Sequence, residues 1–346
     1  MKTRNAQSGF SLIELLVAMG IGMFLIIGAL TVQSNTRKTF TVNENQARLQ
    51  ETARYVFSVI EPELQLAGNY GYSNDASRFR LWISSTNRPR LADMRLWSTQ
   101  VGSIPAILEQ CGKHYAVDLM SAVNADNNSY TLACAAQGGG HNGISDTLTI
   151  RHAMQAASTA SASKYQIQTI RTNPALNEVF MSGAVPETTT FIGDVQVRDM
   201  VVESYYVSVN SDARVGLPAL RVKTLTTNGT SPVMTDQEVI RGVEDIQVEF
   251  GVDPGVDDDL DGKTDYTSGF TREYVAPNHI EVRNGAVSSA RLCVRTRAEQ
   301  AEQGFIDTKT YAYAGNTFGP FNDGFRRVVM CRTIYLRNAR QFEYVP

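Results

Sequence analysis

The sequence has 346 residues, of which 42% are hydrophobic and 19% are charged, and its formal net charge is −3 at pH 7. These values are typical of a folded protein with a sizeable core and exclude a disordered or collagen-like chain. They also exclude the overall positive charge that favours nucleic acid, so direct nucleic-acid binding is not expected. Local basic clusters lie in strand-like sequence and are interpreted as solvated strand faces: Arg326-Arg327, and Arg332, Arg337 and Arg340.

The first predicted element is an apolar stretch from Phe10 to Val32, in which Glu14 is the only charged residue. It is long enough to span a bilayer, which needs about 20 residues. A secretory signal peptide is an alternative, but its apolar region is usually only about 7–15 residues and ends at a small-residue cleavage site. No clear site of that kind follows this stretch.

Charges on either side of this span give a mixed orientation signal. Lys2 and Arg4 precede it and favour a cytoplasmic N-terminus, whereas Arg37 and Lys38 on the far side weaken that preference. A carboxylate such as that of Glu14 costs about 2.5–3.5 kcal/mol at the centre of a membrane helix and less near its end. The span offers no cation at helical spacing, so a partner from another chain is expected.

The helix is predicted to continue beyond the membrane to about residue 66, because apolar residues recur at helical spacing through Ile60. The sequence LAGNYGY at 66–72 is expected to end it. Within the span, Ala18 and Gly22 have the small-xxx-small spacing that permits close helix approach, although glycine is also common in membrane helices generally.

From residue 73 the pattern changes to short strands and turns, which predicts an α+β fold with the helix against an antiparallel sheet. Loop insertions are expected around 73–140 and 155–195, and loops at 137–143 and 155–163. The predicted strands combine alternation with β-branched residues and lie at 146–153, 164–172, 200–210, 219–226, 243–252, 286–298 and 325–338.

The four cysteines form no CxxC pair, so a zinc or thioredoxin-like site is not indicated. An even number in an exported chain suggests disulfides, for which three pairings exist. We favour Cys111–Cys134, which closes a short loop, and Cys293–Cys331, which joins two predicted strands. Free buried thiols are the alternative, and would be preferred in a cytosolic chain.

An acidic segment at 253–266 is the best candidate for a ligand site. Its spacing fits the first part of a calcium loop, in which clustered carboxylates are held together by a hard cation and glycine allows a sharp turn. The candidate ligands are Asp257, Asp259, Asp261, the carbonyl of Lys263, and Asp265. Ser268 stands where an EF-hand has glutamate, so a solvated acidic hairpin loop remains the alternative. If calcium binds, a structural role is expected.

No catalytic motif is recognised: there is no HExxH, no G-x-S-x-G and no phosphate-binding G-K-[ST]. We therefore expect neither an enzyme nor a required cofactor.

The N-terminal sequence GFSLIELLVAM resembles that of type IV pilins and pseudopilins, in which a short basic leader ends in Gly and is followed by Phe and, four residues later, Glu. Gly9, Phe10 and Glu14 match these positions. The resemblance implies that a membrane prepilin peptidase cleaves after Gly9 and that Phe10 becomes an N-methylated first residue. It also implies that Glu14 neutralises the N-terminal amine of a neighbouring subunit during assembly.

Later segments resemble the PilW family of minor pilins, namely ELQLAGNYGY, ISDTLTIRHA, VEDIQVEFGVD and FRRVVMCRTIYLRN. Segment 73–135 carries no such resemblance. The implied organisation is a leader peptide at 1–9, a long helix at 10–66 with a transmembrane segment at about 10–32, and a β-rich periplasmic or extracellular domain at 67–346.

The resemblance implies a minor pilin that primes type IV pilus growth and sits at or near the tip, in a fibre that serves motility and adhesion. The expected location is the inner membrane, with the globular domain in the periplasm, and the pilus after assembly. Expected partners are other minor pilins, the major pilin, a tip adhesin and the inner-membrane assembly platform.

Two other functions remain open. A pseudopilin of a type II secretion system shares the N-terminal motif, and an unprocessed membrane-anchored binding protein would keep residues 1–9. An exported enzyme would require a catalytic constellation that the sequence does not offer.

Overall fold

The computed structural model describes residues 11–84, 86–96, 110–174, 177–181, 194–253, 271–280, 282 and 286–338. The chain divides into two compact units, Met1–Arg48 and Leu49–Pro346. The first contains only helix in its described part, whereas the second contains the end of that helix and all of the described strands.

Helix α1 runs from Leu12 to Leu66 and therefore contributes to both units. It continues through Pro62, and its end agrees with the end predicted from the sequence. Gly68 follows with a φ of +77°, where a β-carbon would also lie 3.0 Å from the carbonyl oxygen of Asn338. Glycine is the residue that adopts this left-handed conformation without strain, so the chain can turn sharply away from the helix axis.

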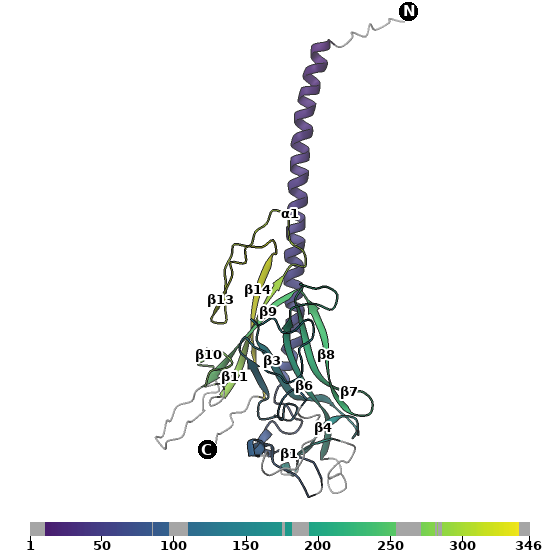
Figure 1. The fold of residues 1–346 in the computed structure, drawn as a ribbon, viewed down its shortest axis with the longest axis vertical. Helices are drawn as coiled ribbons and strands as arrows, with labels where there is room; N and C mark the ends of the chain where they lie inside the picture. The colour runs from purple at the N-terminus through teal and green to yellow at the C-terminus, as the bar shows by residue number, and fades with distance from the viewer. Residues whose placement is uncertain are drawn as a thin grey trace, which may run out of the picture. The chain divides into compact units, whose positions relative to one another are not determined.

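The second unit contains an eight-stranded sheet and a four-stranded sheet, shown in Figure 1. The eight-stranded sheet comprises β1 (Arg80–Leu81), β2 (Val123–Asp126), β3 (Thr147–Ala157), β4 (Tyr165–Ile170), β5 (Glu178–Met181), β6 (Val195–Ser208), β7 (Ala219–Thr227) and β8 (Pro232–Arg241). The four-stranded sheet has the order β10 (Glu273–Val275), β9 (Val243–Asp253), β11 (Ala286–Arg297) and β14 (Arg327–Tyr335).

Short elements complete the described fold: the 3-10 helices η1 (Ala76–Arg78) and η2 (Leu91–Leu96) and the hairpin of β12 (Tyr311–Tyr313) and β13 (Asn316–Phe318). All described strand pairs are antiparallel except β1 with β5. Strand β6 organises the larger sheet because it pairs with β4 near its start, and with β3 and β7 farther along.

The α+β class is confirmed, and each of the seven predicted strands overlaps an observed strand. The expectation of one sheet is wrong, because β9, β10, β11 and β14 form a separate sheet from β1 to β8. The predicted loop at 155–163 also begins too early, since β3 extends to Ala157. Strand β8 was not predicted because it carries many polar, partly exposed residues that obscure a two-residue alternation.

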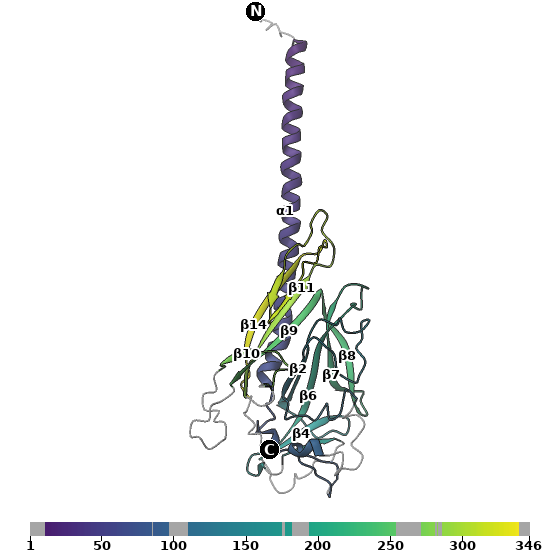
Figure 2. The same ribbon diagram turned by 60° about the vertical axis from the view of Figure 1, so that its left-hand side comes forward.

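The main hydrophobic core forms where α1 meets both sheets, which flank its last turns in Figures 1 and 2. The apolar face of α1 contributes Val56, Phe57, Ile60 and Leu64, each at most 1% exposed. The same cluster takes in buried side chains from β3, β6 and β7 of one sheet and from β9, β11 and β14 of the other. The helix is thus the shared layer of the core.

A second core covers the opposite face of the larger sheet. Buried side chains of segment 70–119 pack there against residues of β3, β4, β5 and β6, including Tyr165, Ile167 and Val202. The hydroxyl of Tyr70, at the start of this segment, donates to the carbonyl of Leu119 at 2.7 Å. The described part of the segment without recognisable resemblance, 73–135, therefore covers this face of the sheet.

Polar contacts also hold α1 to both sheets. Nε2 of His152 on β3 lies 2.6 Å from the carboxylate of Glu63, while Nδ1 faces the carbonyl of Ala153 at 2.9 Å. The contact between His152 and Glu63 joins the last turns of α1 to β3. On the other sheet, Arg332 of β14 pairs with Glu61.

Asp146 connects the two sheets. Its carboxylate accepts the backbone N–H of Asn128 at 2.8 Å and that of Val248 on β9 at 2.7 Å, and its own N–H donates to Ile246. Burial raises the pKa of the Asp146 carboxyl to about 7, although the two hydrogen bonds that the carboxylate accepts lower this pKa. Nearby Asp245 raises it further.

This raised pKa predicts a pH-dependent stability. Between about pH 4 and about pH 7 the folded chain keeps a proton on Asp146 that the unfolded chain has lost, so the contribution of this residue to the unfolding free energy falls as pH rises. The side chain that Asp146→Asn introduces does not titrate. The variant should therefore lose less unfolding free energy relative to the wild type at pH 8 than at pH 5, by on the order of 2 kcal/mol. Urea unfolding of both chains at the two pH values measures this, and equal losses would contradict it.

Candidate functional site

The N-terminal turn of α1 holds Glu14 in a capping arrangement. The backbone N–H of Ser11 donates to Oε2 of Glu14 at 3.2 Å, and the N–H of Ile13 donates to Oγ of Ser11 at 3.4 Å. This reciprocal pattern is a capping box, which the sequence S-L-I-E encodes. It occupies part of the carboxylate's accepting capacity without neutralising its charge. No Lys or Arg occurs between Arg4 and Arg37, so the span itself supplies no cation.

Among the described residues of its own unit, the apolar part of α1 packs against no other element. Its large apolar side chains are exposed, with exposed fractions between 56% for Val17 and 82% for Phe24. Among the described residues, α1 is the one helix that is long and apolar enough to cross a membrane. A surface of this size is not stable in water, so it requires a bilayer or other apolar helices.

Small residues on this helix leave space for such a helix. A β-carbon added at Gly20, Gly22 or Gly28 would meet no heavy atom within 4 Å. Ala18 and Gly22 lie one turn apart on the same side, as the predicted small-xxx-small spacing requires.

Both predicted disulfides are confirmed. Cys111 bonds to Cys134 and closes part of the cover over the larger sheet. Cys293 on β11 bonds to Cys331, which lies directly opposite it on β14. There is no free cysteine.

The predicted calcium ligands, Asp257 to Asp265, lie outside the described residues, as do Gly9 and Phe10. The flanks of the acidic segment are described and belong to adjacent antiparallel strands, β9 and β10. Asp253 at the end of β9 is buried and pairs with Arg272, with Nε and Oδ1 3.2 Å apart. The described flanks of the segment are therefore paired strands, with an ion pair at the point where they leave the sheet.

An arginine–carboxylate–aromatic cluster on the second sheet was missed by the sequence analysis. Arg295 on β11 is fully buried and donates to Glu244 at 3.0 Å and to the hydroxyl of Tyr313 at 2.6 Å. That hydroxyl donates in turn to Asp245. The guanidinium carbon lies 4.6 Å from the ring centroid of Phe318, a distance typical of cation–π contact.

Arg327 belongs to the same cluster, which corrects the interpretation of Arg326-Arg327 as a solvated face. Its guanidinium bonds to both oxygens of Glu244 at 2.7 and 3.0 Å and also pairs with Asp307 and Asp323. It lies 3.9 Å over the ring of Phe321. The alternation of acidic residues along β9 and arginines along β11, which are direct neighbours, is the sequence signal that indicates this pairing.

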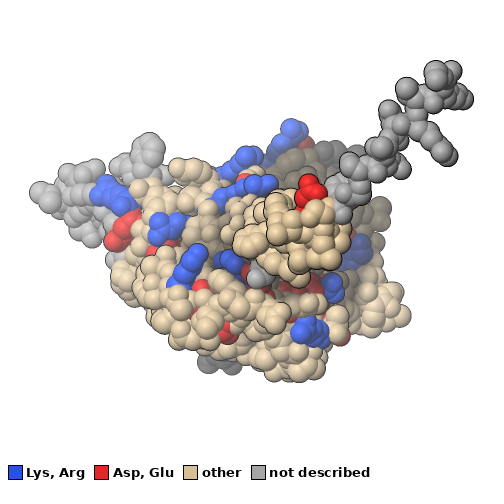
Figure 3. Space-filling view, turned by 90° about the horizontal axis from the view of Figure 1, so that it is seen from above, with Lys and Arg blue, Asp and Glu red and all other residues tan. Residues whose placement is uncertain are grey.

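The face of the molecule drawn in Figure 3 carries dispersed charge. On the face drawn in Figure 3, Lys and Arg form separate patches among neutral side chains and not one continuous basic surface. That distribution differs from the basic stripe that typifies nucleic-acid-binding proteins.

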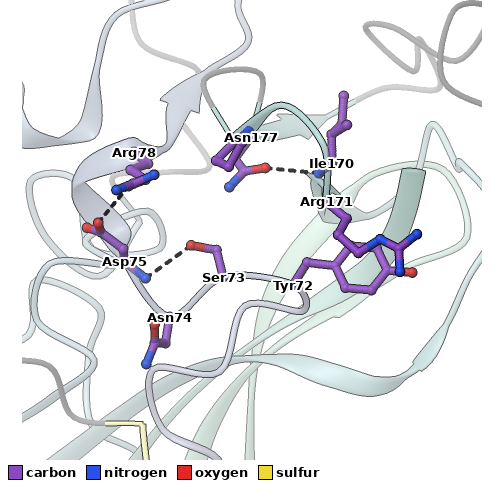
Figure 4. A pocket seen from close by; sticks show the side chains of 9 residues that line it. Tyr72, Ser73, Asn74, Asp75, Arg78, Ile170, Arg171 and Asn177 are labelled. Carbon is purple, nitrogen blue, oxygen red and sulfur yellow. Dashed lines mark hydrogen bonds and ion pairs between the residues drawn. The ribbon is translucent and has the colours of Figure 1, made fainter. Parts of the chain in front are cut away.

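A cavity of about 200 Å³ lies beside η1 and the end of β4, shown in Figure 4. Its charged side chains and Asn177 already have partners: Asp75 pairs with Arg78 at 2.9 Å, Asn177 accepts the N–H of Ile170, and Arg171 pairs with Asp194. Hydrogen bonds from Ser77 and Arg78 outweigh burial and lower the pKa of Asp75, so the carboxylate is ionised and committed to them. The described lining offers no nucleophile next to a base.

Comparison with known proteins agrees with these features. Residues 204–338 match the family described as Type IV Pilus-assembly protein W, PilW, and residues 4–30 match the Prokaryotic N-terminal methylation motif. The second match includes Gly9, Phe10 and Glu14, and the first includes β7, β9, β11 and β14.

No curated protein matches the chain. Among solved structures, the Type IV-like pilin TTHA1219 from Thermus thermophilus aligns over 63% of this chain and 85% of its own length, at 15% identity and a TM-score of 0.27. The family assignment therefore depends on the two sequence matches.

Proposed function

We propose that this chain, a type IV pilin of the PilW type, is a minor pilin that takes part in priming pilus growth and remains at or near the fibre tip. The observation that carries the proposal is the joint presence, on one chain, of the methylation motif at 4–30 and the PilW match at 204–338. The exposed apolar part of α1 supports it, because a fibre of packed helices would bury that surface.

Before assembly, the chain would be anchored in the inner membrane by α1, with Leu49–Pro346 in the periplasm. Two disulfides support an oxidising compartment for the second unit. Lys2 and Arg4 support a cytoplasmic leader, where a prepilin peptidase would cleave after Gly9.

Assembly in this proposal depends on Glu14. Its carboxylate is capped by one backbone N–H and retains capacity for a cation. The N-terminal amine of a neighbouring processed subunit would neutralise it. A buried charge without a partner is strongly unfavourable, so such a pair would select one register between helices.

The proposed partners are other minor pilins, the major pilin, a tip adhesin and the assembly platform. The protein acts by assembly in this proposal and not by catalysis, and motility and adhesion would be properties of the whole fibre. The PilW match favours this role over a type II secretion pseudopilin, which shares only the N-terminal motif.

A structural calcium ion at the acidic connection is a further part of the proposal. The spacing of Asp257, Asp259 and Asp261 supports it, and so does the fixed base of the hairpin at Asp253 and Arg272. The ion would offset repulsion among these carboxylates.

Processing and incorporation can be measured together. Mass spectrometry of sheared surface fibres should find a peptide that begins at N-methylated Phe10. A processed chain confined to membranes would instead favour a pseudopilin, and retention of residues 1–9 would favour a simple membrane anchor.

Glu14→Ala should leave membrane insertion intact, because it removes a charge from the span, but should lower incorporation into fibres. The loss should be on the order of 10-fold or more, since the neighbouring amine would lose its partner. The ratio of fibre-bound to membrane-bound chain measures the effect, with Ser34→Ala as a control on the same helix. Normal incorporation of the Glu14 variant would contradict the pairing.

Calcium should raise the melting temperature of the wild-type chain, and Asp257→Ala combined with Asp259→Ala should abolish that increase. Thermal unfolding with calcium and with a chelator measures it. Asp93→Ala serves as a control outside the acidic segment, and a wild-type chain indifferent to calcium would exclude the site.

A further inference from the structure

The four-stranded sheet ends on one side in β14, a long edge strand. Among the described strands, β14 pairs only with β11, over the nine residues Arg327–Tyr335 and without a register irregularity. Cys331, Arg332 and Thr333 are consecutive and all exposed. Successive side chains of a strand point to opposite faces of its sheet. Solvent therefore reaches the middle of β14 from both faces.

The backbone of β14 presents unused hydrogen-bonding groups on its outer side. In an antiparallel pair, alternate residues bond to the partner strand, and the residues between them direct their N–H and C=O groups away. The N–H of Leu336 donates to the carbonyl of Ser288, which places even-numbered residues on the side of β11. The outward residues, here called the open edge, are Val329, Cys331, Thr333 and Tyr335. In the described part of the chain, no backbone partner stands on that side of them.

The other edge strands of the described sheets carry features that hinder pairing with a further chain. Strands β1, β2 and β10 are only two, four and three residues long. Strand β8 begins at Pro232, carries Asp236, Glu238 and Arg241, and has a register irregularity against β7. Short length, proline, charge and bulges are the usual means by which proteins protect a sheet edge. The open edge of β14 has none of them.

The side chains of the open edge indicate what kind of segment fits beside it. Side chains of an added strand would lie about 4.5–5.5 Å from Val329, Thr333 and Tyr335. These three are uncharged and either β-branched or aromatic, and Tyr335 is 71% exposed. Uncharged β-branched and aromatic residues make favourable cross-strand pairs with them, whereas a charged residue would lose water without gaining a partner. Arg332 points to the other face, where it pairs with Glu61 of α1.

We propose that β14 binds an extended segment of another protein, which adds to the sheet as a strand along the open edge. Main-chain hydrogen bonds supply the affinity, and the side chains of the open edge select an uncharged segment. This inference goes beyond the proposed function, because it assigns a binding surface to the second unit and does not require a place at the fibre tip.

The occupant in this proposal is a different protein and not a second copy of this chain. Symmetric antiparallel pairing of two β14 strands requires a two-fold axis between them. The end of α1 packs against the same sheet, so that axis would also reverse the direction of one helix relative to the other. Two copies whose helices enter one membrane in the same direction cannot pair in this way.

Hydrogen exchange at single residues of the full-length chain tests the proposal. In the chain purified alone in detergent, the N–H groups of Cys331 and Thr333 should exchange quickly. In the chain isolated with its partners from cells that make the complete pilus system, their exchange should slow by on the order of 100-fold. Met330 and Arg332 are internal controls that stay slow in both samples, because their N–H groups bond to β11. Equally fast exchange of Cys331 and Thr333 in both samples would overturn the proposal.

Two substitutions at one position separate backbone pairing from side-chain contact. Thr333→Pro removes an outward N–H that β11 does not use, and proline is tolerated at such positions of an edge strand. Thr333→Val keeps the N–H and is the matched control. A benzophenone amino acid at Tyr335 should form an adduct with one contiguous segment of another protein, identified by mass spectrometry. Its yield should fall by about 10-fold in Thr333→Pro and less than about twofold in Thr333→Val.

Equal adduct yields in the two variants, or adducts with β14 of a second copy, would overturn the proposal. If Thr333→Pro does not fold, the exchange measurement on the wild-type chain still decides. A chain that is found in fibres but keeps fast exchange at Cys331 and Thr333 would overturn the open edge and leave the minor-pilin role intact. A chain absent from fibres, but protected at both positions by another membrane protein, would contradict the tip role and support the open edge.

Discussion

Burial of the apolar face of α1 between the two sheets is the contact on which the second unit depends. Phe57, Ile60 and Leu64 fill the space that both inner sheet faces require, so neither sheet has a complete hydrophobic layer without the helix. Removing a fully buried aromatic side chain of this kind costs about 3–5 kcal/mol, a large fraction of the stability of a typical domain. The same helix that carries the span therefore holds the strands together. The sequence of α1 must satisfy both requirements, and different parts of the helix satisfy each one.

The second sheet shows how a polar face can be as well packed as an apolar one. Arg295 and Arg327 are buried among carboxylates and the rings of Phe318 and Phe321. Removal of these charges from water is costly, and the many hydrogen bonds to Glu244, together with the ring contacts, offset that cost. The arrangement fixes the β12–β13 hairpin over β9 and β11. Because hydrogen bonds and ring contacts are directional, they fix one position of the hairpin, which an apolar contact of the same size would not do.

Sequence patterns predicted the helix, its end near Gly68, seven strands and both disulfides, because each depends on local spacing or on a small number of possible pairings. The division into two sheets was not predicted, since it depends on which strands pair, and alternation within a strand does not specify its neighbour. Arg327 was misinterpreted for the same reason: its carboxylate partners lie on β9 and in the loops before it, so a strand viewed alone looks solvated. Gly9, Phe10 and Glu14 lie within the matched methylation motif, and they could be identified because they stand close together in the sequence. The Ser11–Glu14 capping box is equally local and could have been predicted from S-x-x-E.

The bond between Cys293 and Cys331 has a mechanical consequence. Strand β14 is an edge of its sheet among the described residues, and its Arg332 is paired to Glu61 on α1. Part of any tension along α1 would thus reach an outer strand, which hydrogen bonds alone would let peel away one pair at a time. The covalent link to β11 lies one residue from Arg332 and prevents that unzipping at the point of load. The bond therefore couples β14 to an interior strand next to the point where Arg332 meets the helix.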